Sequence, residues 1–221
     1  TAVKVLNQGG LGALTTNGVQ VVQVDGASNG VFTLANGDYR IGAENALIVG
    51  AYAYVLRQDG GTGAGDWRLR SNVTALPTEP LRPADPGAPS QPGAPVAPDQ
   101  SSITLYQPSV PVYEAYPRAL QALNGVGTLR ERTGQRQWSG AQDAGVWGRL
   151  DGGHARFEPK SSTSLANVTL DSWKVQFGVE RMLSDDQFGG RLVGGLTAHY
   201  GEAKADVSSP FGGGAIDTKG Y

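Results

Sequence analysis

The chain has 221 residues, a formal net charge of −2 at pH 7 and no cysteine. A nearly balanced charge without a stripe of Lys and Arg excludes a nucleic-acid binder, because phosphate contacts need clustered cations. No stretch approaches the ~20 apolar residues of a membrane-spanning helix. Abundant glycine, 33 residues, and the absence of cysteine fit an exported β-rich chain that folds without disulfides.

The sequence pattern of residues 1–72 predicts short β-strands separated by tight turns. Runs rich in Val, Ile, Tyr and Phe alternate with Asn-Gly turns, a combination shared by sandwiches, barrels and the rungs of a parallel β-helix. The expected strands are 19–24, 30–34, 38–41, 47–56 and 67–71. A period of two places Tyr52, Tyr54 and Leu56 on one face of the fourth strand, and Trp67 and Leu69 on one face of the fifth. The sequence therefore predicts a hairpin with a large aromatic face.

This hairpin carries a family resemblance. The segments GAYAYVLRQDGG and GDWRLRSN resemble the C-terminal end of the β-helical passenger of type Va autotransporters of the pertactin-like kind. The resemblance implies that this end caps a right-handed parallel β-helix and acts as an autochaperone that folds first outside the cell. It assigns a passenger-folding core to Tyr52, Tyr54, Leu56, Trp67 and Leu69. A cap is physically sensible, because a β-helix ends in an open sheet edge and an exposed core.

Between residues 77 and 98 every third residue is proline. Polyproline II has three residues per turn, so this run predicts a left-handed rod with its rings along one edge. Collagen is excluded because glycine does not recur at every third position. A PxxP ligand is the alternative, and a solvated spacer is the main prediction.

A helix is predicted from residue 117 to about 132. Pro117 suits a first turn, basic residues suit the negative end of the helix dipole, and Gly134 ends the pattern. An amphipathic helix on a soluble core is the alternative. The segment YQPSVPVYEAYPRALQALNGVGTLRERTG is similar to the start of the autotransporter translocator, and this implies a helix inside a barrel pore. The candidate pore-helix residues are Pro117, Leu120, Leu123, Leu129, Arg130 and Arg132.

Three strands are expected after residue 140, at 145–155, 171–182 and 191–202. Each alternates apolar residues with small or charged ones, which is typical of outer-membrane strands of about 9–11 residues and also of a soluble antiparallel sheet. A tight turn is expected at Asp185-Asp186. The apolar face is expected to meet lipid through Trp173, Val175, Phe177, Val179, Leu192 and Leu196.

The segments GVWGRLDGGHARF and DSWKVQFGVERML look like the first two strands of the same translocator. The family's barrel has more strands than these residues supply, which implies that further sequence or partner chains complete it. The expected fold class is mainly β, with the end of a parallel β-helix, a Pro-rich linker, one helix and the N-terminal part of an antiparallel transmembrane β-barrel. The expected domains are 1–74 (passenger end), 75–104 (linker), 105–137 (extended segment and pore helix) and 138–221 (barrel strands).

No catalytic or metal-binding set is predicted. His154 and His199 lack the Asp, Glu or Cys spacing of a zinc site. No Gly-rich stretch ends as a P-loop does, and no cofactor is expected. Asn124, followed by Gly125, is a candidate for self-cleavage, because some relatives of the family cut their linker by cyclisation of an asparagine. Those relatives use an Asn-Asn pair, from which this chain departs.

The resemblance implies transport and assembly without enzymatic turnover. The barrel and helix would carry the passenger across the outer membrane of a Gram-negative bacterium, and residues 1–74 would promote its folding at the cell surface. The implied partners are outer-membrane lipid, the barrel-assembly machinery, periplasmic chaperones and, through the passenger, a host-surface ligand. The rival prediction is a secreted or surface adhesin, or a ligand-binding module, in which a rigid Pro spacer joins two β domains.

Overall fold

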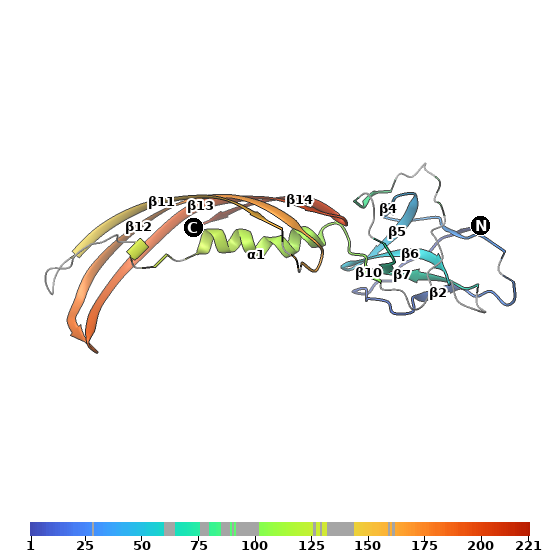
Figure 1. The fold of residues 1–221 in the computed structure, drawn as a ribbon, viewed down its shortest axis with the longest axis horizontal. Helices are drawn as coiled ribbons and strands as arrows, with labels where there is room; N and C mark the ends of the chain where they lie inside the picture. The colour runs from blue at the N-terminus through green and yellow to red at the C-terminus, as the bar shows by residue number, and fades with distance from the viewer. Residues whose placement is uncertain are drawn as a thin grey trace. The chain divides into compact units, whose positions relative to one another are not determined.

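A computed structural model describes residues 1–27, 29–59, 65–75, 80–84, 89, 91, 102–125, 127–128, 130–131, 144–158, 160 and 162–221. The described chain is mainly β, with helix α1 at Val110–Asn124 (Figure 1). The strands are β1 (Ala2–Val3), β2 (Val19–Val22), β3 (Thr33–Leu34), β4 (Tyr39–Ile41), β5 (Glu44–Val49), β6 (Tyr52–Gln58), β7 (Trp67–Arg70), β8 (Asn72–Val73), β9 (Arg82–Pro83), β10 (Ile103–Thr104), β11 (Ala144–Phe157), β12 (Asn167–Gln187), β13 (Gly190–Ser209) and β14 (Gly212–Gly220).

The chain divides into two compact units, which are described separately. The first, called the β unit, contains Thr1–Glu114, Pro159–Ala166 and Ser208–Gly214. The second, called the helix–sheet unit, contains Ala115–Glu158, Asn167–Val207 and Ala215–Tyr221.

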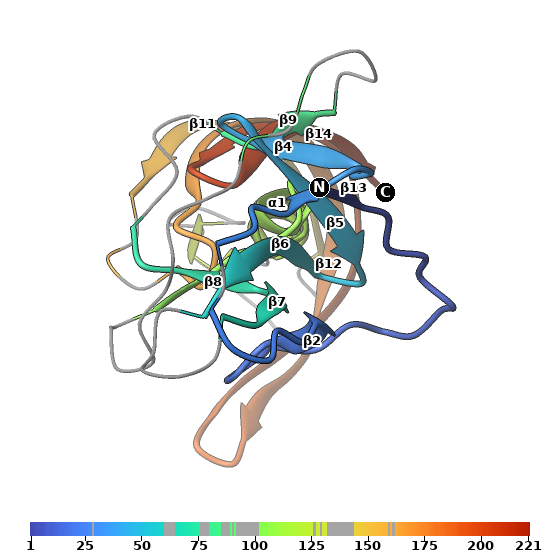
Figure 2. The same cartoon turned by 90° about the vertical axis from the view of Figure 1, so that its right-hand side faces the viewer.

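The β unit is built on a six-stranded sheet in the order β2-β7-β6-β5-β4-β9, with antiparallel neighbours. Figure 2 shows β5, β6 and β7 across its middle. Both faces of β6 are buried, with Tyr54 and Leu56 on one face and Ala53 and Val55 on the other. A strand covered on both sides needs apolar residues at consecutive positions, and the run Tyr52–Leu56 has them.

β5 and β6 form a hairpin where one strand, 47–56, is expected from the sequence. Val49 pairs with Tyr52, and Gly50 turns the chain with a φ of 61°. A side chain at Gly50 would collide with Leu11, because its Cβ would lie 1.7 Å from the Leu11 carbonyl oxygen. The residues on both sides of Gly50 are apolar, so the hydrophobic pattern conceals the turn.

β1 pairs with β3 in parallel, with Ala2 opposite Thr33 and Val3 opposite Leu34. This is the pairing that a parallel β-helix uses between its rungs. The six-stranded sheet that follows is antiparallel, so most of the strands expected in residues 17–72 form hairpins instead of helical rungs.

The described part of the Pro-rich segment lies on the β unit. β9 pairs with β4 at the edge of the sheet, Leu81 beside it is buried, and Arg40 donates to the carbonyl oxygen of Pro89 at 2.7 Å. An edge strand accepts proline, because one of its sides has no ladder hydrogen bond to lose. Residues 81–84 therefore lie along the sheet edge and not in a free spacer, although Arg82 and Pro83 are exposed. Residues 76–79, 85–88, 90 and 92–101 lie outside the described residues.

The chain rejoins the β unit after the Pro-rich segment. β10 pairs with β8, and Leu105 accepts a hydrogen bond from Ala53 and donates one to Ser71. The β unit therefore includes residues up to Glu114, beyond the boundaries expected at 74 and 104.

The helix–sheet unit is built on the strand order β11-β12-β13-β14. β11 and β12 are antiparallel, from Ala144 opposite Arg181 to Phe157 opposite Val168. With 21 and 20 residues, β12 and β13 are longer than predicted. The turn between them lies at Phe188-Gly189, where both residues have positive φ, so the turn expected at Asp185-Asp186 is wrong. Two consecutive positive φ values give the tight turn that matches strand twist.

Helix α1 begins earlier than predicted. The Ser109 carbonyl accepts a hydrogen bond from the Tyr113 N–H at 3.1 Å, so Pro111 lies in the first turn, where its missing N–H leaves no bond unmade. Pro117 therefore lies inside the helix instead of starting it. No helix in the described ranges is long and apolar enough to cross a membrane.

The helix also ends earlier than predicted, at Asn124. Gly125 follows, and a glycine in a helix interior costs about 1 kcal/mol relative to alanine. Arg130 is helical again and exposed. Leu129 and Arg132, also expected in the helix, lie outside the described residues.

Candidate functional site

The predicted aromatic face is a buried cluster of the β unit. Its buried members, called the Trp67 cluster, are Leu34, Leu47, Tyr54, Leu56, Trp67 and Leu69. Tyr52 packs against them while partly exposed. Trp67 is 2 % exposed and meets the ring of Phe32 edge to face at 5.5 Å. The structure thus brings together the residues predicted as a passenger-folding core, and their part in folding stays a prediction.

A second cluster lies on the opposite face of β6 and was not predicted. Its buried members, called the Phe211 cluster, are Ala46, Ala53, Val55, Val73, Leu81, Leu105 and Phe211. Three of its members, Leu81, Leu105 and Phe211, come after residue 80 in the sequence. Phe211 lies in the turn between β13 and β14. Ala53 and Val55, which alternate with the residues of the aromatic face, are the sequence signal that this second face is covered.

A cross-strand ion pair joins Glu44 of β5 to Arg57 of β6 at 2.9 Å. Burial raises the pKa of Glu44 above its ordinary 4.5, and the charge of Arg57 lowers it by less. The folded β unit therefore binds the Glu44 proton more tightly than the unfolded chain does. By linkage, this contribution to stability is complete below the unfolded pKa and is lost as the pH rises through the folded pKa.

Glu44→Gln should remove this pH dependence. We expect the free energy of unfolding of the variant to rise relative to that of wild type as the pH increases from about 4 to about 7, because only the wild type loses the Glu44 proton. Chemical denaturation of both proteins across this pH range measures the difference between their free energies of unfolding. The pH dependence that comes from carboxylates present in both proteins cancels in this difference. A difference that stays constant with pH would contradict the prediction.

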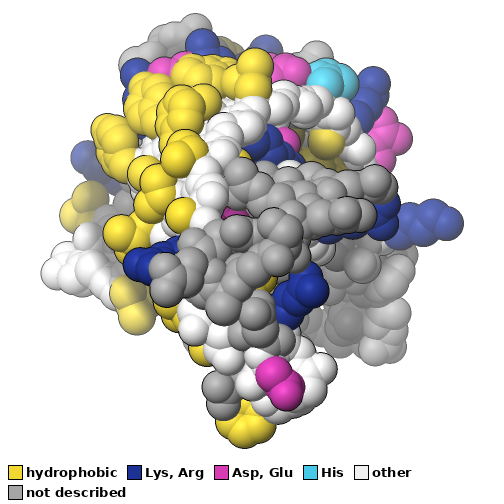
Figure 3. Space-filling model, turned by 90° about the vertical axis from the view of Figure 1, so that its left-hand side faces the viewer, with side chains coloured by type: hydrophobic (Ala, Val, Ile, Leu, Met, Phe, Trp, Pro, Cys, Tyr) yellow, Lys and Arg dark blue, Asp and Glu magenta, His cyan; other side chains and the backbone are white. Residues whose placement is uncertain are grey.

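The convex face of the four-stranded sheet carries exposed apolar side chains (Figure 3). Val146 and Leu150 of β11 are each 75 % exposed, and Leu196 of β13 is 79 % exposed. The same face holds the residues predicted to meet lipid, of which Val175 is half-buried and the others are exposed: Trp173, Val175, Phe177, Val179, Leu192 and Leu196. An exposed apolar face of this kind marks a surface that meets a membrane or a partner.

An aromatic group marks one end of this apolar face. The Tyr200 ring contacts Trp173 at 5.7 Å and Tyr221 at 5.8 Å between centroids. Beyond it the exposed residues are charged, as in the Lys219–Glu202 pair at 3.1 Å. The convex face therefore changes from apolar to polar along the strands, with aromatic rings at the boundary.

The concave face of the sheet is polar by contrast. The Trp147 indole donates to Glu180 at 3.0 Å, and both side chains are buried. Gly178 lies opposite Trp147, and a Cβ at Gly178 would come within 2.3 Å of the indole. Glycine is therefore required where the ring lies across the strand.

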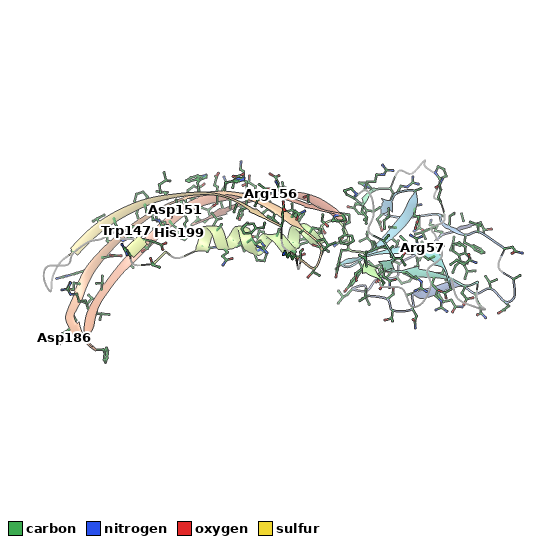
Figure 4. The ribbon with its side chains drawn as sticks, in the orientation of Figure 1. Arg57, Trp147, Asp151, Arg156, Asp186 and His199 are labelled. Atoms are coloured by element: carbon green, nitrogen blue, oxygen red, sulfur yellow. The ribbon has the colours of Figure 1, made fainter. Side chains whose placement is uncertain are left out.

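A polar row crosses three strands on this concave face. Arg149 lies opposite Gln176, and the register set by Gly195 against Glu180 places His199 opposite Gln176 as well. Arg149, Gln176 and His199 each have a buried polar atom without a hydrogen-bond partner among the described residues. Figure 4 labels Trp147, Asp151 and His199 in this stretch of the sheet. Because buried polar atoms need partners, this face is suited to water or to a polar chain segment.

Helix α1, from Ala115 onward, lies along the concave face (Figure 1). Ala115, Ala119 and Leu123 are buried at helical spacing, and a Cβ at Gly220 of β14 would lie 3.3 Å from the Leu123 Cβ. Small residues thus let the helix approach the strand closely. Of the other predicted helix residues, Leu120 is half-buried and Pro117 is exposed.

The C-terminal end of the helix is held by a cation. The Lys174 ammonium donates to the Gly125 carbonyl at 2.7 Å, where a positive charge complements the helix dipole. Arg118 lies over the ring of Phe157 at 4.8 Å. These contacts tie α1 to β11 and β12 within the helix–sheet unit.

The candidate cleavage residue, Asn124, is exposed at the end of α1. Its side-chain amide donates to the Leu120 carbonyl at 3.0 Å. This bond directs the amide nitrogen to the preceding turn, away from the Asn124 carbonyl carbon that cyclisation would attack. His154 contacts Asp171 at 2.6 Å on the outer face. Within the described ranges no group of three or more His, Asp or Glu side chains is placed to bind a metal.

The chain is similar in sequence to three known proteins. It is 42 % identical over 239 aligned residues to the adhesin BmaC autotransporter of Brucella suis biovar 1 (strain 1330), and the match covers 100 % of the chain and 6 % of that protein. It is 27 % identical to the uncharacterized protein YdeU and 34 % identical to the uncharacterized protein YuaQ, both of Escherichia coli (strain K12). These matches cover 95 % and 91 % of the chain.

The chain spans less than half the length of each relative, since it covers 42 % of YdeU and 13 % of YuaQ. No family model matches the chain, and no solved structure matches it. The match to BmaC along the whole chain supports a relationship to autotransporters, and the name of that relative is that of an adhesin and not of an enzyme.

Proposed function

We propose that the chain is the export and folding end of an autotransporter of a Gram-negative bacterium. In this proposal β11–β14 are the first strands of an outer-membrane β-barrel, α1 lies in its lumen, and residues 1–74 promote passenger folding at the cell surface. The observation that carries the proposal is the contrast between the two faces of the four-stranded sheet. Exposed apolar residues cover one face, and buried polar residues and a helix occupy the other.

The dimensions of the outer face support a membrane position. The exposed apolar residues of β12 run from Trp173 to Leu183, interrupted by exposed Arg181, and a strand needs about 9–11 residues to cross a bilayer. Trp173, Tyr200 and Tyr221 lie where the face becomes charged, the position of the aromatic girdle of outer-membrane barrels.

The passenger role rests on the β unit. The Trp67 cluster gives it a core of its own, and the parallel pairing of β1 with β3 provides a point at which β-helical rungs would join. Passenger folding supplies the energy for export in this proposal. The barrel-assembly machinery, periplasmic chaperones and outer-membrane lipid are the partners that the proposed family implies.

Cell fractionation tests the membrane part of the proposal. Expressed with its natural flanking sequence in a Gram-negative host, the protein should sediment with the outer membrane, resist alkaline extraction and need detergent for solution. A monomer that is soluble without detergent would support the rival, a secreted adhesin module of two β domains. The observation that favours an adhesive passenger is the name of the relative BmaC, which is that of an adhesin.

A further inference from the structure

The turn between β13 and β14 supplies a core residue to the β unit. Phe211 in this turn is 1 % exposed and belongs to the Phe211 cluster, beside Val55 of β6 and Leu105. The turn of the neighbouring hairpin, between β12 and β13, holds Phe188, which is 100 % exposed. Two hairpin turns of one sheet thus carry a phenylalanine, and one of them is fully buried.

An aromatic series connects this turn to β6. The Phe211 ring meets Tyr106 edge to face at 5.7 Å, and Tyr106 stacks on Tyr52 at 5.8 Å. Tyr52 and Tyr106 also form a backbone bridge. Aromatic pairs of this kind stabilise a core beyond the area that they bury. Phe211 is therefore joined to the first residue of β6 through rings in contact.

The backbone of the turn also approaches the β unit closely. Gly212 has a φ of 151°, and a Cβ on it would lie 2.6 Å from the Pro108 Cβ and 2.8 Å from the Pro108 Cα. In the exposed hairpin turn, a Cβ on Gly189 would have no described atom within 4 Å beyond its own chain neighbours. A side chain is thus excluded at Gly212 by a contact that Gly189 does not make.

Hydrogen bonds fix the turn within the β unit. The Ser209 hydroxyl donates to the Ser164 carbonyl at 2.6 Å and accepts from the Phe211 N–H at 3.1 Å. Ser164 in turn donates through its N–H and its hydroxyl to Glu114 of α1. Glu114 also accepts bonds from Ser162 and Thr163. The turn, the loop at 162–164 and the start of α1 therefore form one connected network.

We propose that the β13–β14 turn, Ser209–Gly212, is a docking site on which the β unit completes its fold, with Phe211 as the inserted residue. The cluster on this face of β6 needs residues from three distant parts of the chain, near 81, 105 and 211. Contacts between residues so far apart in the sequence close long loops, and loop closure slows their formation. Insertion of Phe211 thereby completes the core of the β unit. That this step takes place at the cell surface rests on the proposed function.

Hydrogen exchange in the purified full-length protein, kept in detergent, tests the docking. In Phe211→Ala we expect the peptide that covers β6 to exchange about tenfold faster or more, because a large-to-small change in a core opens the strand that it covers. Phe188→Ala is the matched control and should exchange within about twofold of wild type, since its ring is exposed.

If the Phe211→Ala protein does not accumulate, a second pair of variants tests the docking of the turn. Gly212→Ala should speed exchange of β6, because its methyl group displaces the turn from Pro108, whereas Gly189→Ala should leave the exchange of β6 unchanged. Wild-type exchange of β6 in Phe211→Ala or in Gly212→Ala would overturn the proposal. Exchange is measured in detergent and does not depend on export, so absence of wild-type protein from the outer membrane would count against the proposed function alone.

Discussion

Trp67→Ala should lower the free energy of unfolding of the β unit by about 3–5 kcal/mol, as other large-to-small changes of buried aromatic residues do. Trp67 is 2 % exposed and packs in the cluster of β6 and β7. Its indole N–H has no hydrogen-bond partner among the described residues, so the loss is one of packing. The cavity would separate Phe32 from Leu69 and loosen the face on which the aromatic hairpin rests.

Limited proteolysis followed by mass spectrometry measures this effect. We expect fragments from residues 1–75 to appear earlier in Trp67→Ala than in wild type. Trp173→Ala is a suitable control, because Trp173 is 42 % exposed on the outer face of the other unit and its loss should leave the β unit resistant. Wild-type resistance of the β unit in Trp67→Ala would count against its proposed role in passenger folding.

Leu196→Arg should destabilise the proposed membrane-inserted barrel by about 2–4 kcal/mol, the cost of a basic residue near the bilayer midplane. Leu196 is 79 % exposed on the convex face. The guanidinium would have to leave water for hydrocarbon or distort the bilayer around it. We expect less folded protein in the outer membrane and a lower midpoint of urea unfolding in lipid vesicles.

Thr197→Arg is the control for this second change. Thr197 is the next residue of β13 and points to the concave face, where Arg149 already lies. The same charge introduced there should be tolerated, because it faces the polar interior that the proposal assigns to the lumen. Equal losses in the two variants would show that the convex face does not meet lipid.

The sequence predicts which residues share a face more reliably than where elements end. Alternation alone separates Phe177 and Val179 from Gln176 and Glu180, and the structure exposes the first pair and buries the second. A period of two determines the face of each residue as soon as a strand is recognised. The aromatic hairpin follows in the same way, because its tyrosines and Trp67 recur at alternate positions.

The sequence predicts the ends of helices and strands, and contacts between residues far apart in the chain, less well. The sequence favours Pro117 as a helix start, although Pro111 satisfies the same rule nearly two turns earlier, and local sequence does not rank the two. The Phe211 cluster could not be predicted, because the sequence of β6 does not indicate which later residues of the chain pack on it. Leu81 was hidden for a related reason, since the regular proline spacing around it indicated a solvated rod.

The burial of Phe211 has a consequence for fusion proteins built on this chain. A foreign cargo fused in place of residues 1–107 would remove Val55, Leu105 and Tyr106, which pack against Phe211, and leave the Phe211 ring exposed. Exposed aromatic residues of this kind promote association between molecules. Such a fusion should therefore either retain residues 1–114 or replace Phe211 by a polar residue such as serine.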